Sequence, residues 1–206
     1  VEGNRALAEA ADLVVLAVKP NALDAVAGEV AAAGTPVLSI LAGTTLARLG
    51  EALPGVELIR VMPNLGAQLR QAVLCVAYGD GIDPGLREGA ESALALLGEV
   101  IELDEELIDP ATAITGCAPG YLALMAEALV EAGVSEGLTE AQARAMAAKA
   151  MSATGGLLEV REPAELKRAV ASPGGMTEAG LEALTERDFR GALRAAVDAS
   201  LARVRG

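Results

Sequence analysis

The sequence contains no histidine and no tryptophan, and it has only one phenylalanine and two tyrosines among 206 residues. Without imidazole side chains, histidine-based catalytic triads, zinc sites with imidazole ligands and histidine general acids are excluded. Two cysteines, Cys75 and Cys117, lie far apart and form no CxxC pair. This spacing favours reduced thiols in a cytosolic compartment over a disulfide framework. Any chemistry must therefore use other groups.

Basic side chains are also scarce, because 16 Lys and Arg stand against 29 Asp and Glu and the formal net charge is -13. Such a charge repels phosphate backbones and anionic membranes, so we expect neither nucleic acid nor a membrane as a partner. Uninterrupted apolar runs such as Leu13–Val18 are too short to cross a bilayer. The chain opens on Val1 without a visible targeting segment. With 52% hydrophobic residues, the composition predicts a folded cytoplasmic protein.

Short apolar runs alternate with alanine-rich stretches in the first half of the chain. This order is typical of repeated βα units, in which helices cover a mostly parallel sheet. We therefore predict an α/β region there. Its expected strands are Leu13–Val18, Val37–Leu41, Glu57–Val61, Val73–Tyr78 and Glu99–Leu103, and its expected helices are Ala22–Ala33, Leu46–Leu53 and Pro84–Leu97.

The second half is expected to be all-helical, since apolar residues after Glu106 recur at helical spacing and no strand-like run follows. Thr139 and Gln142 have the spacing of a capping box, which predicts a helix running towards Ser152. The pattern places one domain over residues 1–105 and a second over 106–206. Because so few aromatic side chains are available for the helical core, we expect a second copy of the chain to cover it as a homodimer or higher homo-oligomer.

Three turns follow predicted strands at the edge where open α/β sheets bind their ligands. They are Ala17–Asn21, Leu41–Thr44 and Met62–Asn64. Their proline and glycine residues are equally consistent with turns that only end the strands, so no single turn is specific.

A fourth turn, Ser172–Thr177, contains two adjacent glycines before a predicted helix over Glu178–Leu184. Backbone amides in such a loop can cradle a carboxylate with help from the helix dipole. The alternative is an ordinary loop in which Thr177 is the helix N-cap.

Two further features have simpler interpretations. Cys117 has no histidine to activate it and no basic neighbour in the sequence, so a packed thiol is favoured over a nucleophile. Glu105 and Glu106 are interpreted as solvated surface carboxylates without a role.

Taken in order, these segments resemble the pyrroline-5-carboxylate reductase family. Val14–Pro20 is similar to the AVKP segment of that family, Val37–Gly43 to its serine-containing strand, and Arg60–Asn64 to its RVMPN motif. In the helical half, Asp109–Tyr121 resembles the stretch that ends in SGSGPAY, and Ala171–Thr177 resembles the SPGG signature. The helix over Glu127–Gly137 and the Phe189–Arg190 turn also resemble the corresponding family segments. The similarity extends over essentially the whole chain.

The resemblance implies an incomplete Rossmann-type parallel sheet followed by a C-terminal helical dimerisation domain. It implies an oxidoreductase of proline biosynthesis that uses NADPH, or NADH, to reduce the C=N bond of 1-pyrroline-5-carboxylate to L-proline. Thr177 is the implied catalytic residue, because its hydroxyl suits a hydrogen bond to the ring nitrogen. The implied cofactor-binding residues are Ala17, Val18, Lys19, Pro20, Ile40, Leu41, Ala42 and Asn64, and the implied substrate-binding residues are Ser172, Gly174, Gly175, Met176 and Thr177. No metal is implied.

Several departures from the family pattern leave alternatives open. No glycine-rich phosphate-binding turn lies before Leu13, and we expect that unit to precede Val1 in the natural protein. Met176 stands where the family has a small residue or threonine, Ala169 replaces a polar residue that some members direct at the cofactor, and the turn at Cys117 is altered. A paralogous reductase for another cyclic imine and a non-catalytic dimerisation module therefore remain as alternatives.

Overall fold

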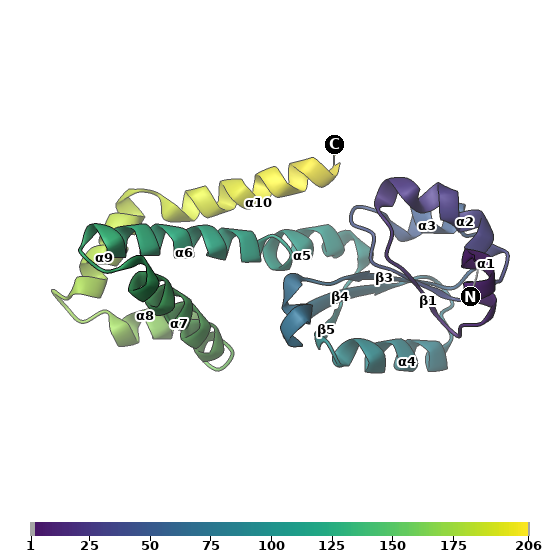
Figure 1. Cartoon of the computed structure of the whole chain (residues 1–206), viewed down its shortest axis with the longest axis horizontal. Coiled ribbons are helices and arrows are strands. Elements are labelled where there is room, and N and C mark those ends of the chain that lie inside the picture. Colours follow the sequence, from purple (N-terminus) through teal and green to yellow (C-terminus); the bar gives the residue numbers. More distant parts are fainter. Residues whose placement is uncertain (1–2, 206) are drawn as a thin grey trace. The chain divides into compact units, whose positions relative to one another are not determined.

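The computed structural model describes residues 3–205 and separates them into two compact units (Figure 1). The sheet unit comprises the chain up to Cys117 together with the last residues from Leu201, and the helical unit comprises Ala118–Ser200. Val1, Glu2 and Gly206, the outermost residues of the two predicted domains, lie outside the described part. The predicted boundary after residue 105 falls within the sheet unit, at a 3-10 turn.

Five strands form one sheet in the order β1-β2-β3-β4-β5. The α/β class predicted for this half is confirmed, and three of the four strand pairings are parallel. β3 and β4 are antiparallel, which the sequence analysis did not predict. The physical reason is the short connection over residues 63–71, since a parallel crossover needs about a dozen residues or more. The strands are β1 (Val14–Leu16), β2 (Val37–Ser39), β3 (Leu58–Met62), β4 (Ala72–Tyr78) and β5 (Gly98–Glu102).

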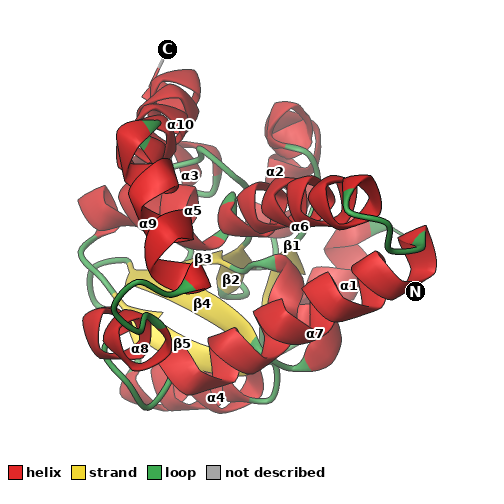
Figure 2. Cartoon of the chain, turned by 90° about the vertical axis from the view of Figure 1, so that its left-hand side faces the viewer, coloured by secondary structure: helices red, strands yellow, loops and turns green. Residues whose placement is uncertain are grey.

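Helices cover both faces of this sheet (Figure 2). Successive residues of β3 point to opposite faces, so Leu58 packs in one core cluster with α2 and α3, and Ile59 packs in another with α4. α5 lies against β4 through Ile108, which is fully buried beside Cys75. The helices of this unit are α1 (Asn4–Glu9), α2 (Leu23–Ala31), α3 (Leu46–Ala52), α4 (Pro84–Ala95) and α5 (Ile108–Thr115), with 3-10 turns η1 (Pro20–Ala22), η2 (Leu65–Leu69) and η3 (Glu105–Leu107).

The helical unit confirms that no strand follows β5 in the described chain. The side chain of Thr139 accepts a hydrogen bond from the Gln142 amide at 3.3 Å, and Gln142 accepts one from the Thr139 amide at 3.0 Å, so the predicted capping box is present. The Tyr121 hydroxyl joins α6 to α10 through Ser200 Oγ at 2.7 Å. The helices are α6 (Ala118–Ser135), α7 (Glu140–Leu158), α8 (Pro163–Val170), α9 (Met176–Glu186) and α10 (Phe189–Arg205).

Very little of the helical unit is buried. Among its described residues only Ala143 and Ala147 belong to the buried apolar core. Leu122, Leu124 and Leu129 of α6 expose 51%, 67% and 50% of their surface. Exposed apolar side chains on this scale are typical of surfaces that interact with another molecule.

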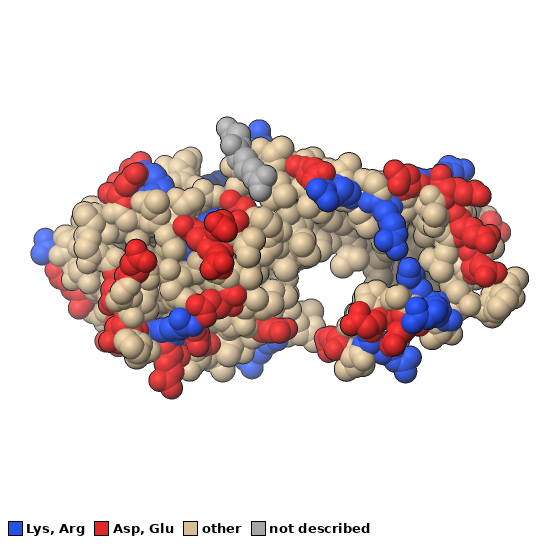
Figure 3. Space-filling view, turned by 180° about the vertical axis from the view of Figure 1, so that it is seen from behind, with Lys and Arg blue, Asp and Glu red and all other residues tan. Residues whose placement is uncertain are grey.

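One helical stretch in the described chain, Glu105–Ser135, is long and apolar enough to cross a membrane by length and composition, and 6% of its most apolar window is buried. The expectation of no such segment rested on uninterrupted apolar runs, and it missed this stretch because α5 and α6 follow one another with only a few charged residues. Acidic side chains are spread over the face of the molecule shown in Figure 3, in agreement with the net charge of -13.

Candidate active site

Three of the predicted ligand turns come together in the sheet unit. β1, β2 and β3 are parallel, so the segments after Leu16, Ser39 and Met62 leave the same edge of the sheet. The Ile40 amide donates to the Leu16 carbonyl at 3.1 Å and so links the turn after β2 to the end of β1. The edge therefore presents backbone from three neighbouring strands.

The turn after β1 is open to solvent. Ala17, Lys19 and Pro20 are exposed, whereas Val18 packs partly against the core. Lys19 makes no ion pair with any described residue. This turn therefore presents one small exposed side chain, Ala17, and one cation, Lys19, to a ligand.

The turn after β2 has a defined shape. Ser39 is fully buried, and its hydroxyl accepts a hydrogen bond from the Leu41 amide at 3.3 Å. The Leu41 side chain points into the core at 2% exposure, so this residue offers only its backbone to a ligand. Ala42 is exposed, and Gly43 has φ +67°, a conformation that favours glycine.

Asn64 follows β3 and uses its side chain within the protein. Its Oδ1 accepts from the amides of Gly66 and Val73 at 3.1 and 3.2 Å, and its Nδ2 donates to the Thr115 carbonyl at 3.2 Å. These bonds fix the turn against the end of α5. A role for Asn64 at a cofactor stays a prediction.

The Leu65–Gly66 segment after Asn64 has a tight geometry. A Cβ on Gly66 would lie 2.3 Å from the Gln71 carbonyl oxygen, so a side chain does not fit without a shift of the backbone. The Gly66 carbonyl in turn accepts from the Gln71 amide at 3.0 Å. This segment closes tightly on itself and leaves Leu65 exposed.

In the helical unit, the Ser172–Thr177 segment forms a turn that requires glycine. The Gly175 amide donates to the Ser172 carbonyl at 2.9 Å, and Gly174 has φ +70°. A Cβ on Gly175 would lie 2.4 Å from Ser172 Oγ. Glycine at both positions therefore lets the chain turn directly into α9.

The N-terminus of α9 differs from the predicted one. Gly175 is the N-cap and α9 begins at Met176, so the alternative that Thr177 caps the helix is wrong. No side chain caps this helix within the described chain. The Met176 and Thr177 amides therefore have no intrahelical acceptor, and the Thr177 side chain is exposed. The neighbouring Gly174 amide is already engaged, because it donates to Glu178 Oε2 at 2.6 Å.

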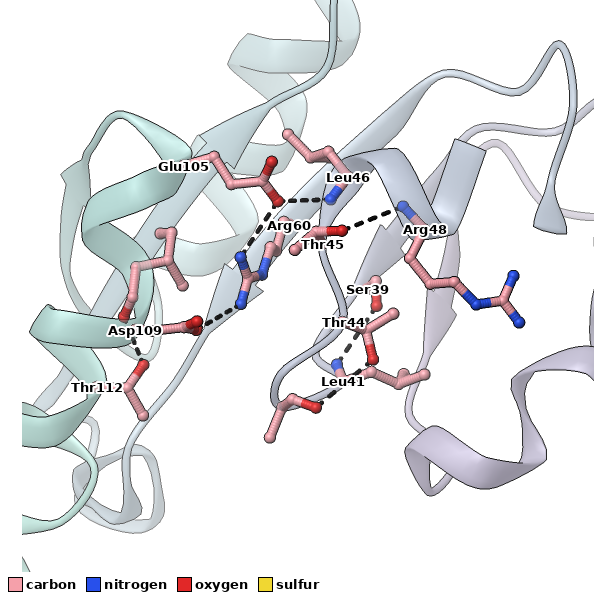
Figure 4. Close-up of polar contacts among 12 residues, drawn as sticks. Ser39, Leu41, Thr44, Thr45, Leu46, Arg48, Arg60, Glu105, Asp109 and Thr112 are labelled. Carbon is pink, nitrogen blue, oxygen red and sulfur yellow. Dashed lines mark hydrogen bonds and ion pairs between the residues drawn. The ribbon is translucent and has the colours of Figure 1, made fainter. Parts of the chain in front are cut away.

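The sequence analysis missed a buried ion cluster (Figure 4). Arg60 of β3 is 2% exposed and pairs with Glu105 Oε1 at 3.2 Å and with Asp109 Oδ1 at 2.8 Å. Glu105 was interpreted as solvated surface, and that interpretation is wrong because a buried guanidinium requires carboxylate partners. Glu106 is exposed, as expected. The sequence signal that could have revealed this cluster is Arg60, the one charged residue inside an apolar strand.

Two other side chains of the sheet unit, Cys75 and Tyr78, have shifted pKa values. Burial raises the pKa of the Cys75 thiol, so this residue is an inert part of the core. Burial and a hydrogen bond to Glu91 raise the pKa of Tyr78, whose ring lies under the Arg87 guanidinium. That cluster belongs to the α4 side of the sheet and not to the turns. Cys75 and Cys117 are both unpaired.

A family model described as pyrroline-5-carboxylate reductase dimerisation matches residues 105–206. The pyrroline-5-carboxylate reductase of Synechocystis is 37% identical over 204 residues, which are 97% of this chain and 76% of that protein. The Thermus thermophilus enzyme of the same name is 39% identical over 194 residues, or 94% of this chain and 74% of that protein. The present chain thus spans about three quarters of these relatives.

Solved structures give the same result. The Coxiella burnetii pyrroline-5-carboxylate reductase superposes with a TM-score of 0.91 at 30% identity, covering 100% of this chain and 79% of that one. The Plasmodium falciparum pyrroline carboxylate reductase, solved with NADP bound, has a TM-score of 0.91 at 25% identity and covers 99% of this chain and 80% of that one. From the relatives, the family model and these structures, the chain belongs to the pyrroline-5-carboxylate reductase family.

Proposed function

We propose that this protein reduces the C=N bond of 1-pyrroline-5-carboxylate with NADPH or NADH and so forms L-proline in amino-acid biosynthesis. One observation carries the proposal: relatives named for this activity are 37% and 39% identical across nearly the whole chain. The two features that the reaction needs, an open strand edge and an uncapped helix N-terminus behind a glycine turn, are both present.

The strand edge suits the nicotinamide and ribose part of the cofactor. Ala17 and Ala42 expose small side chains, Gly43 keeps the second turn narrow, and Lys19 offers a cation without a partner in the described chain. Ala17–Pro20 and Ile40–Ala42 would hold the cofactor in this arrangement, with Asn64 fixing the third turn. When bound, the reduced nicotinamide supplies the hydride that adds to the C=N carbon.

The turn before α9 suits the substrate. The Met176 and Thr177 amides, at the positive end of the helix dipole, would bind the substrate carboxylate. Ser172, Gly174 and Gly175 shape that turn. The Thr177 hydroxyl would hydrogen-bond the ring nitrogen as it changes from a C=N nitrogen to an amine, because a hydroxyl can either donate or accept.

A homodimer would complete the helical unit. α6 contains no buried residue in the single chain, and its exposed leucines would be covered if two copies packed together. The matched family model is a dimerisation domain, which supports this assignment. The same contact would cover much of the exposed apolar surface of the Glu105–Ser135 stretch without a membrane. A cytoplasmic location remains part of the proposal, and the two unpaired cysteines agree with it.

The direct test is NADPH oxidation in the presence of 1-pyrroline-5-carboxylate, with protein made from the complete reading frame. We expect NADPH consumption to match L-proline formation mole for mole. Binding of NADPH without turnover would contradict the substrate assignment, and neither binding nor turnover would favour the non-catalytic dimerisation module.

A second candidate substrate is another cyclic imine acid. Met176 is 95% exposed at the substrate turn, so its side chain can reach a bound ring or its substituents. A panel of cyclic imine acids that differ in ring size separates the two assignments through their kcat/KM values. A larger ring that reacts faster than the pyrroline would favour the second candidate.

A further inference from the structure

The buried ion cluster reaches the turn that follows β2. Glu105 Oε1 pairs with Arg60, and the same oxygen accepts a hydrogen bond from the Leu46 amide. Leu46 is the first residue of α3, and only the N-cap Thr45 separates it from the Leu41–Thr44 turn that holds Ala42 and Gly43. Figure 4 shows Glu105 between Arg60 and Leu46. One carboxylate thus connects a buried strand residue to the end of a candidate ligand turn.

The Leu46 amide is one of the first-turn groups of α3 that have no intrahelical acceptor. The N-cap Thr45 accepts from the Arg48 amide at 3.1 Å, so its side chain serves a different donor. Glu105 therefore satisfies a group that the helix leaves unpaired. A carboxylate at this end of the helix also lies favourably in the helix dipole. The Leu46 contact fixes where the preceding turn ends.

Arg60 holds Glu105 in place. The Arg60 side chain is 2% exposed, whereas those of Glu105 and Asp109 are 29% and 26% exposed. In the sheet register Arg60 lies beside Ser39, whose hydroxyl accepts from the Leu41 amide at the other end of the same turn. The turn after β2 is thereby anchored at both of its ends.

We propose that Glu105, held by Arg60, is a positioning residue that sets the turn after β2 for the nicotinamide cofactor. This inference rests on the proposed function, since it takes that turn to be part of the cofactor site. Glu105 acts through the Leu46 amide and touches no substrate atom. Asp109 pairs with the same arginine but makes no hydrogen bond or ion pair to the turn among the described residues, so we assign it a structural role only.

The two carboxylates form a matched pair of variants. In Glu105→Ala, Arg60 keeps Asp109 as a partner, and in Asp109→Ala it keeps Glu105, so neither change leaves the buried guanidinium alone. The expected result is a rise of about tenfold in KM and Kd for NADPH in Glu105→Ala, the loss typical of one charge-assisted hydrogen bond. KM for the imine stays unchanged. Asp109→Ala keeps KM for NADPH within about twofold of wild type.

A purely structural role would lower the melting temperature in both variants and leave both KM values of the folded enzyme unchanged, which would overturn the proposal. If Glu105→Ala does not fold, Glu105→Gln gives the test, because it keeps an acceptor for the Leu46 amide without the charge. It is expected to raise KM for NADPH less than alanine does, and an unchanged value would also overturn the proposal. A wild-type enzyme without turnover would instead contradict the proposed function.

Discussion

The sheet unit and the helical unit bury their apolar residues in different ways. Ile59, Val61 and Val76 of the sheet unit are 0–1% exposed, whereas Leu124 of the helical unit is 67% exposed. The sheet unit thus buries its core apolar side chains within a single chain. In the described part of the helical unit most large apolar side chains remain exposed in the single chain, and under the proposed homodimer a second copy would cover them.

The largest expected effect is on the association of chains through the exposed apolar surface of the helical unit. Leu124→Glu places a carboxylate on the apolar surface of α6, and a twofold interface carries it twice, at several kcal/mol for each unpaired buried charge. We expect complete loss of the oligomer at micromolar concentration, measured by light scattering. Leu96→Glu, at a residue of the sheet unit that is 71% exposed, is the control and should leave the mass unchanged. An intact oligomer in Leu124→Glu would show that α6 lies outside the interface.

A smaller effect is expected from the core of the sheet unit. Ile59→Ala removes a fully buried side chain and leaves a cavity, at a cost of about 3 kcal/mol in the free energy of unfolding. Denaturant titration checks this value. Ile101→Ala on the edge strand β5, where the side chain is 37% exposed, should cost about 1 kcal/mol or less. Equal losses in the free energy of unfolding of the two variants would mean that the sheet unit, too, buries its exposed apolar side chains against another molecule.

The smallest expected effect on stability comes from the capping box at the start of α7 in the helical unit. Thr139→Ala removes the N-cap of α7 and its capping box, at a cost of about 1 kcal/mol. The measurement is the thermal midpoint at fixed protein concentration, since assembly of the proposed homodimer would make the midpoint depend on concentration. Gln142→Glu keeps an acceptor for the Thr139 amide and should leave the midpoint unchanged. An unchanged thermal midpoint in Thr139→Ala would indicate that packing alone fixes the start of α7.

The sequence predicts the elements of this fold well where local chemistry decides them. Pro84 begins α4 behind the cap of Asp83, whose Oδ1 accepts from the Gly85 and Leu86 amides, and Thr139 begins α7. Strand direction is different, because an apolar run has the same pattern in either direction. The antiparallel pairing of β3 with β4 was readable only from the short connection between them.

The candidate site could be predicted only in part. The glycine turn before α9 and the turns after β1 and β2 carry local signals, and all of them have defined conformations in the structure. The contact between Glu105 and Leu46 spans distant parts of the chain, so no local pattern contains it. The charged Arg60 within an apolar strand implied that carboxylate partners exist, but it did not identify them.

The imine is proposed to bind at the turn before α9 through Thr177, and one variant tests this placement most directly. Thr177→Ala removes the hydroxyl proposed to bond the ring nitrogen, and Thr185→Ala, at the other end of α9, is the matched control. We predict that Thr177→Ala lowers kcat/KM for 1-pyrroline-5-carboxylate about tenfold or more, or about 1.4 kcal/mol in transition-state stabilisation, while NADPH affinity stays unchanged. Unchanged kcat/KM in Thr177→Ala would contradict the account.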